Sequence, residues 1–589
     1  MPKVTISAAI SITFFPFLIK LTGMVGEFLT WFPWAIFIIL FVSMFVAQLV
    51  VPILQFFMIK KPITSESKAL VKLQEAYDWL IERCFRYPLW TVAVAIACCI
   101  LGCVMMAGLP QRMMPDAERN QFAVEIFMPT GTALDKTAEV ADSLERYMRQ
   151  DERIVSIASF KGTASPRFHN AYAPQSGGPN FAQFIVNTVS NEATDELVQK
   201  YKAELTEAIP DALVRIKQLS YGMEAAPIEV RLTGDDLTDL RTASDTVMQR
   251  MRQMPELILV RPDYNEPLAT TRIVLDEDVA SRFSITNSTV EQAMAMRYTD
   301  GLTVSTAWDG DYDTDVKLKS THSDEATPQD VMDELIPAGL GTVPLRQIAT
   351  VRPGWHYGQI PHRNGLRTFT IMAEVTGKTN VMGMTETLME RLSDVTLPEG
   401  VKLSYGGQYE GDNEQAPGIM SALIIAVAII FFILLWHFKR ISTASLILCC
   451  LLLCVFGAAV GVIIQGTDFG MTSILGIISL MGILVRNGII MFDYAEELRE
   501  TERLSAHDAI FLSAKRRMRP ILLTSLAASM GVIPMILSGS HLWSPMGAVI
   551  CYGTLITMLF ILTVMPVLYA GMMRDSDKRL AKRLALEKE

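Results

Sequence analysis

The sequence predicts a polytopic α-helical membrane protein with a large α/β domain outside the cytoplasm. Half of the 589 residues are hydrophobic, and the mean hydropathy is +0.29. The apolar residues come in blocks of about 17 to 25 residues, the length that a helix needs to cross a bilayer. A polar block, residues 110–417, separates these apolar blocks and is long enough to bury a core of its own.

Eight apolar blocks are candidate membrane spans: residues 4–21, 31–58, 88–109, 418–436, 443–464, 470–495, 520–537 and 545–573. The first block is too long for a signal peptide, and no small-residue cleavage pattern follows it. We therefore expect two helices in residues 1–58, one in 88–109, five in 418–573, and a cytoplasmic tail in 574–589. The linker 59–87 contains an amphipathic stretch that we expect to lie along the cytoplasmic membrane surface.

Basic residues in the short connections indicate the orientation, because Lys and Arg gather on the cytoplasmic side of a membrane. The opposite connections, "TGMVGEFLT", "QGTDFG" and "SGSHLWSP", contain neither residue type. The polar block lies on the same side as these connections, so we expect it outside the cytoplasm. The basic residues are Lys60, Lys61, Arg83, Arg86, Lys439, Arg440, Arg499, Arg503, Lys515, Arg516, Arg517, Arg519, Arg574 and Lys578.

Composition argues against several classes of function. The net charge of -10 gives no basic surface for nucleic acid. The eight cysteines lie in or beside the spans, so they neither cross-link the polar block nor show zinc spacing. The stretch "TGKT" at 376–379 lacks the first glycine of a phosphate loop. We expect no enzymatic activity and no cofactor, and, because His169, His356, His362 and His541 show no ligand spacing, no metal site.

The polar block alternates strand and helix patterns in three rounds. Each round reads strand, helix, strand, which is the split βαβ unit of ferredoxin-like folds. The last strand of the third round is expected near 368–378 or 402–410. The three rounds cover residues 121–162, 180–220 and 227–265.

The two ends of the chain resemble each other. Pro2, Thr5, Pro16, Pro33 and Pro52 find counterparts in Pro520, Thr524, Pro534, Pro545 and Pro566, with small gaps. Parallel repeats of this kind build transporters. The second copy follows three spans and a large domain, so the repeat predicts that a comparable first half belongs in front of Met1.

The span in "SLMGILVRNGIIMFDYAEELR", residues 479–499, carries Arg486 near its centre. A charged side chain at this depth usually faces a bundle interior and pairs with another charge. No span offers a carboxylate at mid-depth, and Asp493 lies two helical turns away, about 10.5 Å along the axis. We therefore expect that this chain does not supply the counter-ion of Arg486.

The chain resembles the resistance-nodulation-division (RND) efflux transporters, and among them the proton-driven multidrug (acriflavine-resistance type) branch that exports hydrophobic and amphiphilic compounds. The resemblance is carried by "GILVRNGIIMFDYAEELR", "AKRRMRPILLTSLAASMGVIPM", "MPKVTISAAISITFFPFLIKLTGMVGEF" and "ERNQFAVEIFMPTGTALDKT". It covers essentially the whole chain, which is similar to the C-terminal half of such a transporter plus the last two helices of the N-terminal half. It implies two porter subdomains, 116–224 and 225–265 with 351–409, and a docking insertion, 266–350.

The resemblance also implies a proton relay formed by Arg486, Asn487, Arg517 and Thr524. In the family, paired aspartates of the first half contact a lysine at the position of Arg486. Arginine can still pair with carboxylates but does not release its own proton. Alternatives are a snorkelling Arg486, a positive-inside anchor for Arg517, and a Thr524 hydroxyl bonded within its own helix.

The connection "SFKGTASPRFHNAYAPQSGGPNF" matches the family's switch loop, which lines the substrate pocket. Its candidate contacts are Phe160, Phe168, Phe181 and Phe184, of which the last two also fit a strand core. The resemblance implies drug/proton antiport across a bacterial inner membrane by a homotrimer that binds a periplasmic adaptor and an outer-membrane channel. Alternatives are the metal-exporting RND branch, a scaffold subunit, and a truncated or split half that assembles with a partner but does not transport alone.

Overall fold

The structure is a computed structural model. It describes residues 26–27, 31–58, 68–169, 171–172, 175–205, 209–222, 224–264, 266–298, 301–318, 320, 327–339, 341–376 and 380–586. These residues belong to two compact units, one formed by 1–128, 133–262 and 369–589, and the other by 129–132 and 263–368. The predicted span 4–21 lies outside the described residues.

Within the described residues, seven helical segments are long and apolar enough to cross a membrane, at the positions of the other seven predicted spans. Four of them continue into polar sequence: α16 begins ten residues before its apolar part, α19 and α20 extend at one end, and α22 continues beyond residue 573. The segments are α4–η1–α5 (Trp31–Phe45, Val46–Val50 and Val51–Met58), α7 (Pro88–Ala107), α16 (Gln408–Phe438), α17–α18 (Ile441–Leu451 and Leu453–Gln465), α19 (Met471–Thr501), α20–α21 (Ala506–Gly531 and Ile533–Leu537) and the first part of α22 (Ser544–Leu586).

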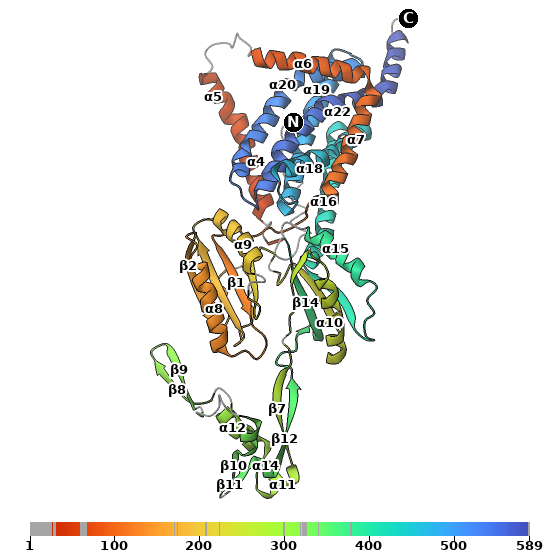
Figure 1. Ribbon diagram of the computed structural model, residues 1–589. Helices are drawn as coiled ribbons and strands as arrows, with labels where there is room; N and C mark the ends of the chain where they lie inside the picture. Colours follow the sequence, from red (N-terminus) through yellow and green to blue (C-terminus); the bar gives the residue numbers. More distant parts are fainter. Residues whose placement is uncertain are drawn as a thin grey trace. The chain divides into compact units, whose positions relative to one another are not determined.

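Helices α18, α19 and α20 pack against α22 to form the centre of the bundle (Figure 1). Small residues allow the close approach of α18 and α22. A Cβ atom on Gly461 would lie 2.7 Å from the carbonyl oxygen of Ala548, and one on Gly457 would lie 3.1 Å from the Cα atom of Gly553. Glycine contacts of this kind are typical of helix packing in membranes.

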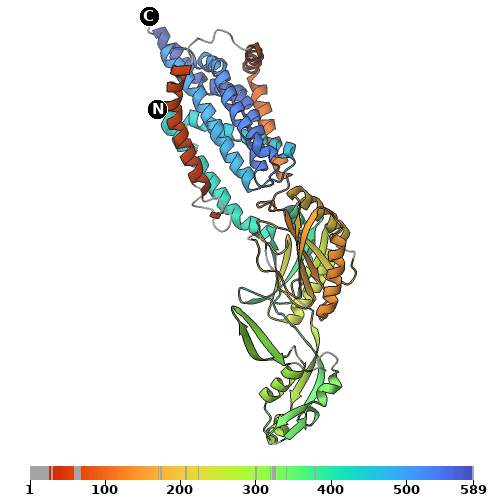
Figure 2. The same cartoon turned by 90° about the vertical axis from the view of Figure 1, so that its left-hand side faces the viewer.

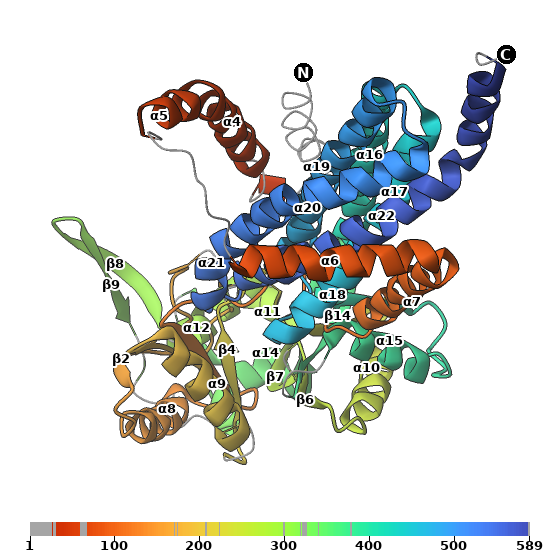
Figure 3. The same cartoon turned by 90° about the horizontal axis from the view of Figure 1, so that it is seen from above.

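The amphipathic linker forms α6 (Lys68–Arg86), which lies across α20 and α22 (Figure 3). The Tyr77 hydroxyl donates a hydrogen bond to the Leu562 carbonyl oxygen at 2.9 Å, and Glu82 accepts one from Lys515 at 2.8 Å. Trp79 stays exposed on the other side of the helix. The helix therefore has one face on the bundle and one face free.

Residues 121–218 form a first sheet with strands β1 (Gln121–Phe127), β2 (Ile154–Lys161), β3 (Phe181–Thr188) and β4 (Leu213–Gln218). The strand order is β2-β3-β1-β4, and all the pairs are antiparallel. Helices α8 (Leu134–Met148) and α9 (Asn191–Leu205) cover one face (Figure 2). Alternate strand residues such as Phe122, Val124 and Ile126 point into the core beneath them.

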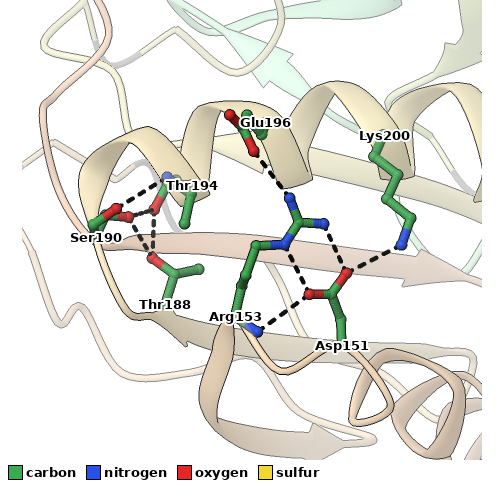
Figure 4. Close-up of polar contacts among 8 residues, drawn as sticks. Asp151, Arg153, Thr188, Ser190, Thr194, Glu196 and Lys200 are labelled. Atoms are coloured by element: carbon green, nitrogen blue, oxygen red, sulfur yellow. Dashed lines mark hydrogen bonds and ion pairs between the residues drawn. The ribbon is translucent and has the colours of Figure 1, made fainter.

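The turn between α8 and β2 is fastened to α9 by an ion cluster (Figure 4). The Asp151 carboxylate accepts hydrogen bonds from Arg153 at 2.8 and 2.9 Å and from Lys200 at 3.1 Å. Arg153 also reaches Glu196 at 3.0 Å. The hydrogen bonds from Arg153 hold the pKa of Asp151 well below its ordinary value, so this cluster stays ionised at neutral pH.

A second sheet contains β5 (Ile228–Thr233), β6 (Leu257–Pro262), β14 (Leu366–Val375) and β15 (Lys402–Gly407). Its order is β14-β5-β15, with β6 on the other side of β14 and the short β13 (His362–Arg363) pairing with the start of β14. Helices α10 (Leu237–Arg252) and α15 (Val381–Leu392) accompany it. The two positions predicted for a closing strand, 368–378 and 402–410, are thus both strands of this sheet.

The second unit has a small core of its own, which includes Ile336, Leu345 and Ile348. The predicted insertion 266–350 lies within this unit. Its elements are β7 (Leu268–Leu275), α11 (Glu277–Arg282), α12 (Asn287–Tyr298), β8 (Leu302–Asp309), β9 (Tyr312–Leu318), α13 (Pro328–Met332), β10 (Leu335–Ala338), β11 (Gly341–Pro344), α14 (Leu345–Ile348) and β12 (Ala349–His356).

Candidate functional site

Arg486 lies in the middle of α19, a helix that packs against both α20 and α22. Its side chain is half-buried, and the Nε and Nη2 atoms are buried without a hydrogen-bond partner. Among the residues that the structure describes, Arg486 forms no ion pair. A guanidinium group presents five N–H donors, so this arrangement leaves strong donors available for a carboxylate.

Asn487 follows Arg486 and is fully packed between helices, with 1% of its surface exposed. Its Nδ2 atom donates to the Ser525 hydroxyl of α20 at 3.4 Å, while its Oδ1 atom is buried without a partner. Further toward the C-terminus of α19, the Ser513 hydroxyl of α20 donates to the Met491 carbonyl oxygen at 2.7 Å. Polar contacts therefore fix α20 beside the segment of α19 that carries Arg486.

Arg517 and Thr524 lie on α20 but do not meet Arg486 through a direct contact. The Arg517 guanidinium stacks over the Tyr494 ring with its Cζ atom 4.3 Å from the ring centre. The Thr524 side chain is exposed, and its hydroxyl donates to the Ile521 carbonyl oxygen at 3.0 Å. This bond within its own helix is the alternative that the sequence left open for Thr524, so its relay role stays a prediction.

Asp493, the acid two turns from Arg486, has a partner that the sequence did not indicate. His437 at the end of α16 lies with its Nε2 atom 2.7 Å from Asp493 Oδ1. One turn further, Glu496 accepts hydrogen bonds from Arg440 at 3.0 Å and from the Tyr569 hydroxyl at 2.5 Å. These contacts join α16, α19 and α22 at the end of the bundle that the basic loops mark as cytoplasmic. A single histidine in "LLWHFKR" carries no spacing signal from which this pairing could be predicted.

The phenylalanines predicted to contact substrate fall into two groups. Phe160 at the end of β2 and Phe168 in the loop that connects β2 and β3 are half-buried, and the ring centres of Phe168 and Tyr172 are 5.1 Å apart. Phe181 is packed against Phe127 with ring centres 5.2 Å apart, and Phe184 is fully buried in the core under α8 and α9. The strand pair therefore has a packing role in this structure, and the loop pair is the better candidate for contact with a substrate.

Several buried charges in the sheets were missed by the sequence analysis. Glu125, Arg215 and Glu374 are each in a strand, and Arg215 forms an ion pair with each of the two glutamates. A charged residue within an otherwise apolar strand, as in "QFAVEIF", was the available signal. No group of three or more His, Cys, Asp or Glu side chains suited to a metal ion occurs among the described residues.

Comparisons with known proteins give consistent matches over nearly the whole chain. The model of the AcrB/AcrD/AcrF family matches residues 1–573. Protein HelA of Legionella pneumophila is 24% identical over 586 residues, which cover 95% of this chain and 55% of that protein. The cobalt-zinc-cadmium resistance protein CzcA of Cupriavidus metallidurans is 24% identical over 581 residues, which cover 95% of this chain and 54% of that protein.

Solved structures match equally widely. Two crystal forms of a heavy metal efflux pump superpose with a TM-score of 0.82 at 20% identity, over 97% of this chain and 58% of the pump. The likeness therefore extends across the membrane bundle and the α/β domain. The chain spans about half the length of the curated relatives that it matches.

Proposed function

This chain belongs to the AcrB/AcrD/AcrF family of RND efflux transporters, and from that premise we propose that it forms part of a proton-driven exporter of heavy-metal cations. It is a multi-pass protein of the inner membrane. Its family is one of transporters. Proton coupling, the identity of the cargo and assembly with other proteins are parts of the proposal, because the chain covers only about half of the length of its relatives.

The proposed proton coupling rests on the surroundings of Arg486. A guanidinium with free donors inside a membrane span favours a pair of carboxylates beside it, and these would come from a segment that the described residues do not include. Arginine keeps its charge, so the protons would bind to and leave the acids. Asn487 would hold α20 against this site, with Arg517 and Thr524 further along the relay.

The proposed cargo is supported by the names of the relatives, which include a cobalt-zinc-cadmium resistance protein and a heavy metal efflux pump. This corrects the emphasis of the sequence analysis, which placed the multidrug branch first. Since the described residues lack a cluster of three His, Cys, Asp or Glu side chains, the cation ligands would include thioethers or groups from other segments.

A second candidate cargo is a hydrophobic or amphiphilic compound. It is favoured by the aromatic cluster of Phe160, Phe168 and Tyr172 on the loop face of the first sheet. Aromatic side chains around a loop bind apolar ligands without metal ligands. For this candidate, Phe168→Ala should change susceptibility to at least one compound, whereas an unchanged profile for all compounds would remove it.

We further propose that the chain works as a homotrimer with a periplasmic adaptor and an outer-membrane channel, and that its two sheets are ferredoxin-like porter subdomains. The strand order β2-β3-β1-β4 supports the fold assignment. A first half with the acidic relay residues would complete the transporter. The alternative is a split or truncated half that assembles with a partner without transporting alone.

Growth of a deletion strain on cobalt, zinc and cadmium salts, beside growth on amphiphilic dyes, tests the cargo. The completed transporter should restore metal tolerance, Arg486→Met should not, and the exposed Arg86→Met is the matched control for loss of one positive charge. Restored dye tolerance without restored metal tolerance would replace the metal proposal with the second candidate. Equal rescue by Arg486→Met would contradict the relay.

A further inference from the structure

The first sheet buries both of its faces. Side chains alternate along β1, so Phe122, Val124 and Ile126 point toward α8 and α9, while Ala123 and Glu125 point the other way. This second face is covered by the β2–β3 loop, whose Ala171 and Tyr172 pack against Ala123 and Ile185. The loop that carries Phe168 therefore rests on a face that contains a charged residue.

Glu125 has no exposed surface, so both of its carboxylate oxygens need donors. The Tyr172 hydroxyl donates to Oε1 at 2.7 Å, and Arg215 of β4 donates to Oε2 at 3.2 Å. Gln183 of β3 donates to the Tyr172 hydroxyl and accepts a hydrogen bond from the Ser165 backbone N–H at 2.7 Å. The loop is thus fixed to the sheet by polar contacts made through Glu125 and Gln183.

Arg215 extends these contacts to the second sheet. Its Nε and Nη2 atoms lie 2.7 and 2.5 Å from Glu374 Oε1 of β14. A further contact between the sheets is made by Arg261 of β6, whose Cζ atom lies 4.1 Å from the centre of the Phe127 ring. We call this interface between the two sheets the joint. It contains a buried ion pair, and polar interfaces allow two subdomains to move relative to each other.

We infer that Tyr172, Glu125, Arg215 and Glu374 form a connector through which the position of Phe168 on its loop is coupled to the joint between the two sheets. The inference rests on the proposed function in one respect, that cargo contacts Phe168. When Tyr172 is displaced, the fully buried Glu125 carboxylate loses one of its hydrogen-bond donors. Glu125 then depends on Arg215, and a change in the contact between Arg215 and Glu125 also changes the contact between Arg215 and Glu374. Tyr172, Glu125 and Arg215 are positioning residues, because they act through Phe168 and β14 and not on the cargo.

Hydrogen exchange of the purified full chain tests the connector without transport. Glu374→Gln should raise exchange roughly threefold or more in peptides covering residues 160–169, although Glu374 contacts none of these residues. Because coupling is reciprocal, Tyr172→Phe should raise exchange in peptides covering residues 366–375 of β14. If one of the two variants fails to fold, the other still tests the connector.

Tyr147→Phe is the matched control, since the Tyr147 hydroxyl also donates to a glutamate, Glu204, at 3.0 Å, but on the exposed side of α8. It should leave both sets of peptides unchanged. Unchanged exchange in both distant segments, or the same change in the control, would overturn the connector.

Transport by the completed transporter supplies the second readout. Tyr172→Phe and Glu374→Gln should each shift the half-saturating cargo concentration, and the double variant should fall short of the product of the two shifts by roughly threefold or more. Shifts that multiply would contradict the connector. If the wild type moves no cargo, the proposed function fails while the exchange experiment still decides the connector.

Discussion

Arg486 in the membrane bundle and Arg215 between the two sheets are both removed from water, but their surroundings differ. Arg215 is held by two glutamates, and its guanidinium bridges two strands of different sheets. Arg486 has buried donors without a partner among the described residues. A buried charge with its partners present belongs to the folded structure of this chain, whereas a buried charge without them points to a group supplied from elsewhere.

The broadest test of this difference is transport by the chain alone. If Arg486 depends on acids from another segment, the chain expressed alone in a pump-deficient bacterial host should show efflux no greater than that of the empty host. Metal accumulation and dye retention, with and without an uncoupler, measure this. Robust efflux that depends on the proton gradient would show that the chain contains a complete relay.

Replacing Arg486 in the completed transporter tests its role in transport. Arg486→Met should abolish efflux without loss of assembly, because the packing around it rests on glycines and aliphatic residues such as Gly488, whose added Cβ would lie 3.0 Å from Met565. Arg486→Lys should retain substantial efflux, since lysine also carries a positive charge. Efflux and oligomer recovery are measured together. A snorkelling arginine would instead leave both variants with normal efflux.

Replacing Arg215 should destabilise the folded chain, whereas replacing Arg486 should not. Arg215→Met leaves Glu125 and Glu374 buried without their shared cation, which costs about 3–5 kcal/mol in systems of this kind. Thermal unfolding of the purified chain should therefore move to a clearly lower temperature. Arg486→Met should leave the unfolding temperature unchanged or raise it, because it removes donors that lack partners. Equal losses in the two variants would mean that Arg486 also has a structural partner.

Much of the fold could be predicted because hydropathy and alternation are local signals. The seven described spans and the strand-helix-strand rounds follow from them. The start of α16 at Gln408 was missed, since its first turns are polar and outside the apolar block. Hydropathy detects the part of a helix that lies in lipid and not its continuation into water.

The charged contacts could not be predicted for a different reason. Glu125 and Arg215 occupy strand positions that alternation assigns to solvent, and only the loop and the second sheet bury them. His437 and Asp493 are 56 residues apart on different helices. Arg486 could be identified because one charge in an apolar span is conspicuous without its neighbours, but its counter-ion could not.

The smallest effect is expected at Lys217, a second buried cation on β4, the strand that carries Arg215. Burial lowers the pKa of Lys217 to about 8, against the raising influence of Glu125 and Glu374 and together with Arg215 and Arg261. Its ammonium group lies 5.1 Å from the Tyr172 ring. Below pH 8 the lysine is charged in both the folded and the unfolded chain, so the cost of burying that charge is fully present. Between pH 8 and 10.5 the folded chain binds fewer protons than the unfolded chain, so stability from this group rises with pH.

Lys217→Met should therefore stabilise the chain by on the order of 2 kcal/mol at pH 7 and by little at pH 10.5. Thermal unfolding at the two pH values measures the difference, with the exposed Lys402→Met as control. A gain that is equal at both pH values would assign the effect to packing, and a loss at pH 7 would place Lys217 among the charges that the joint requires.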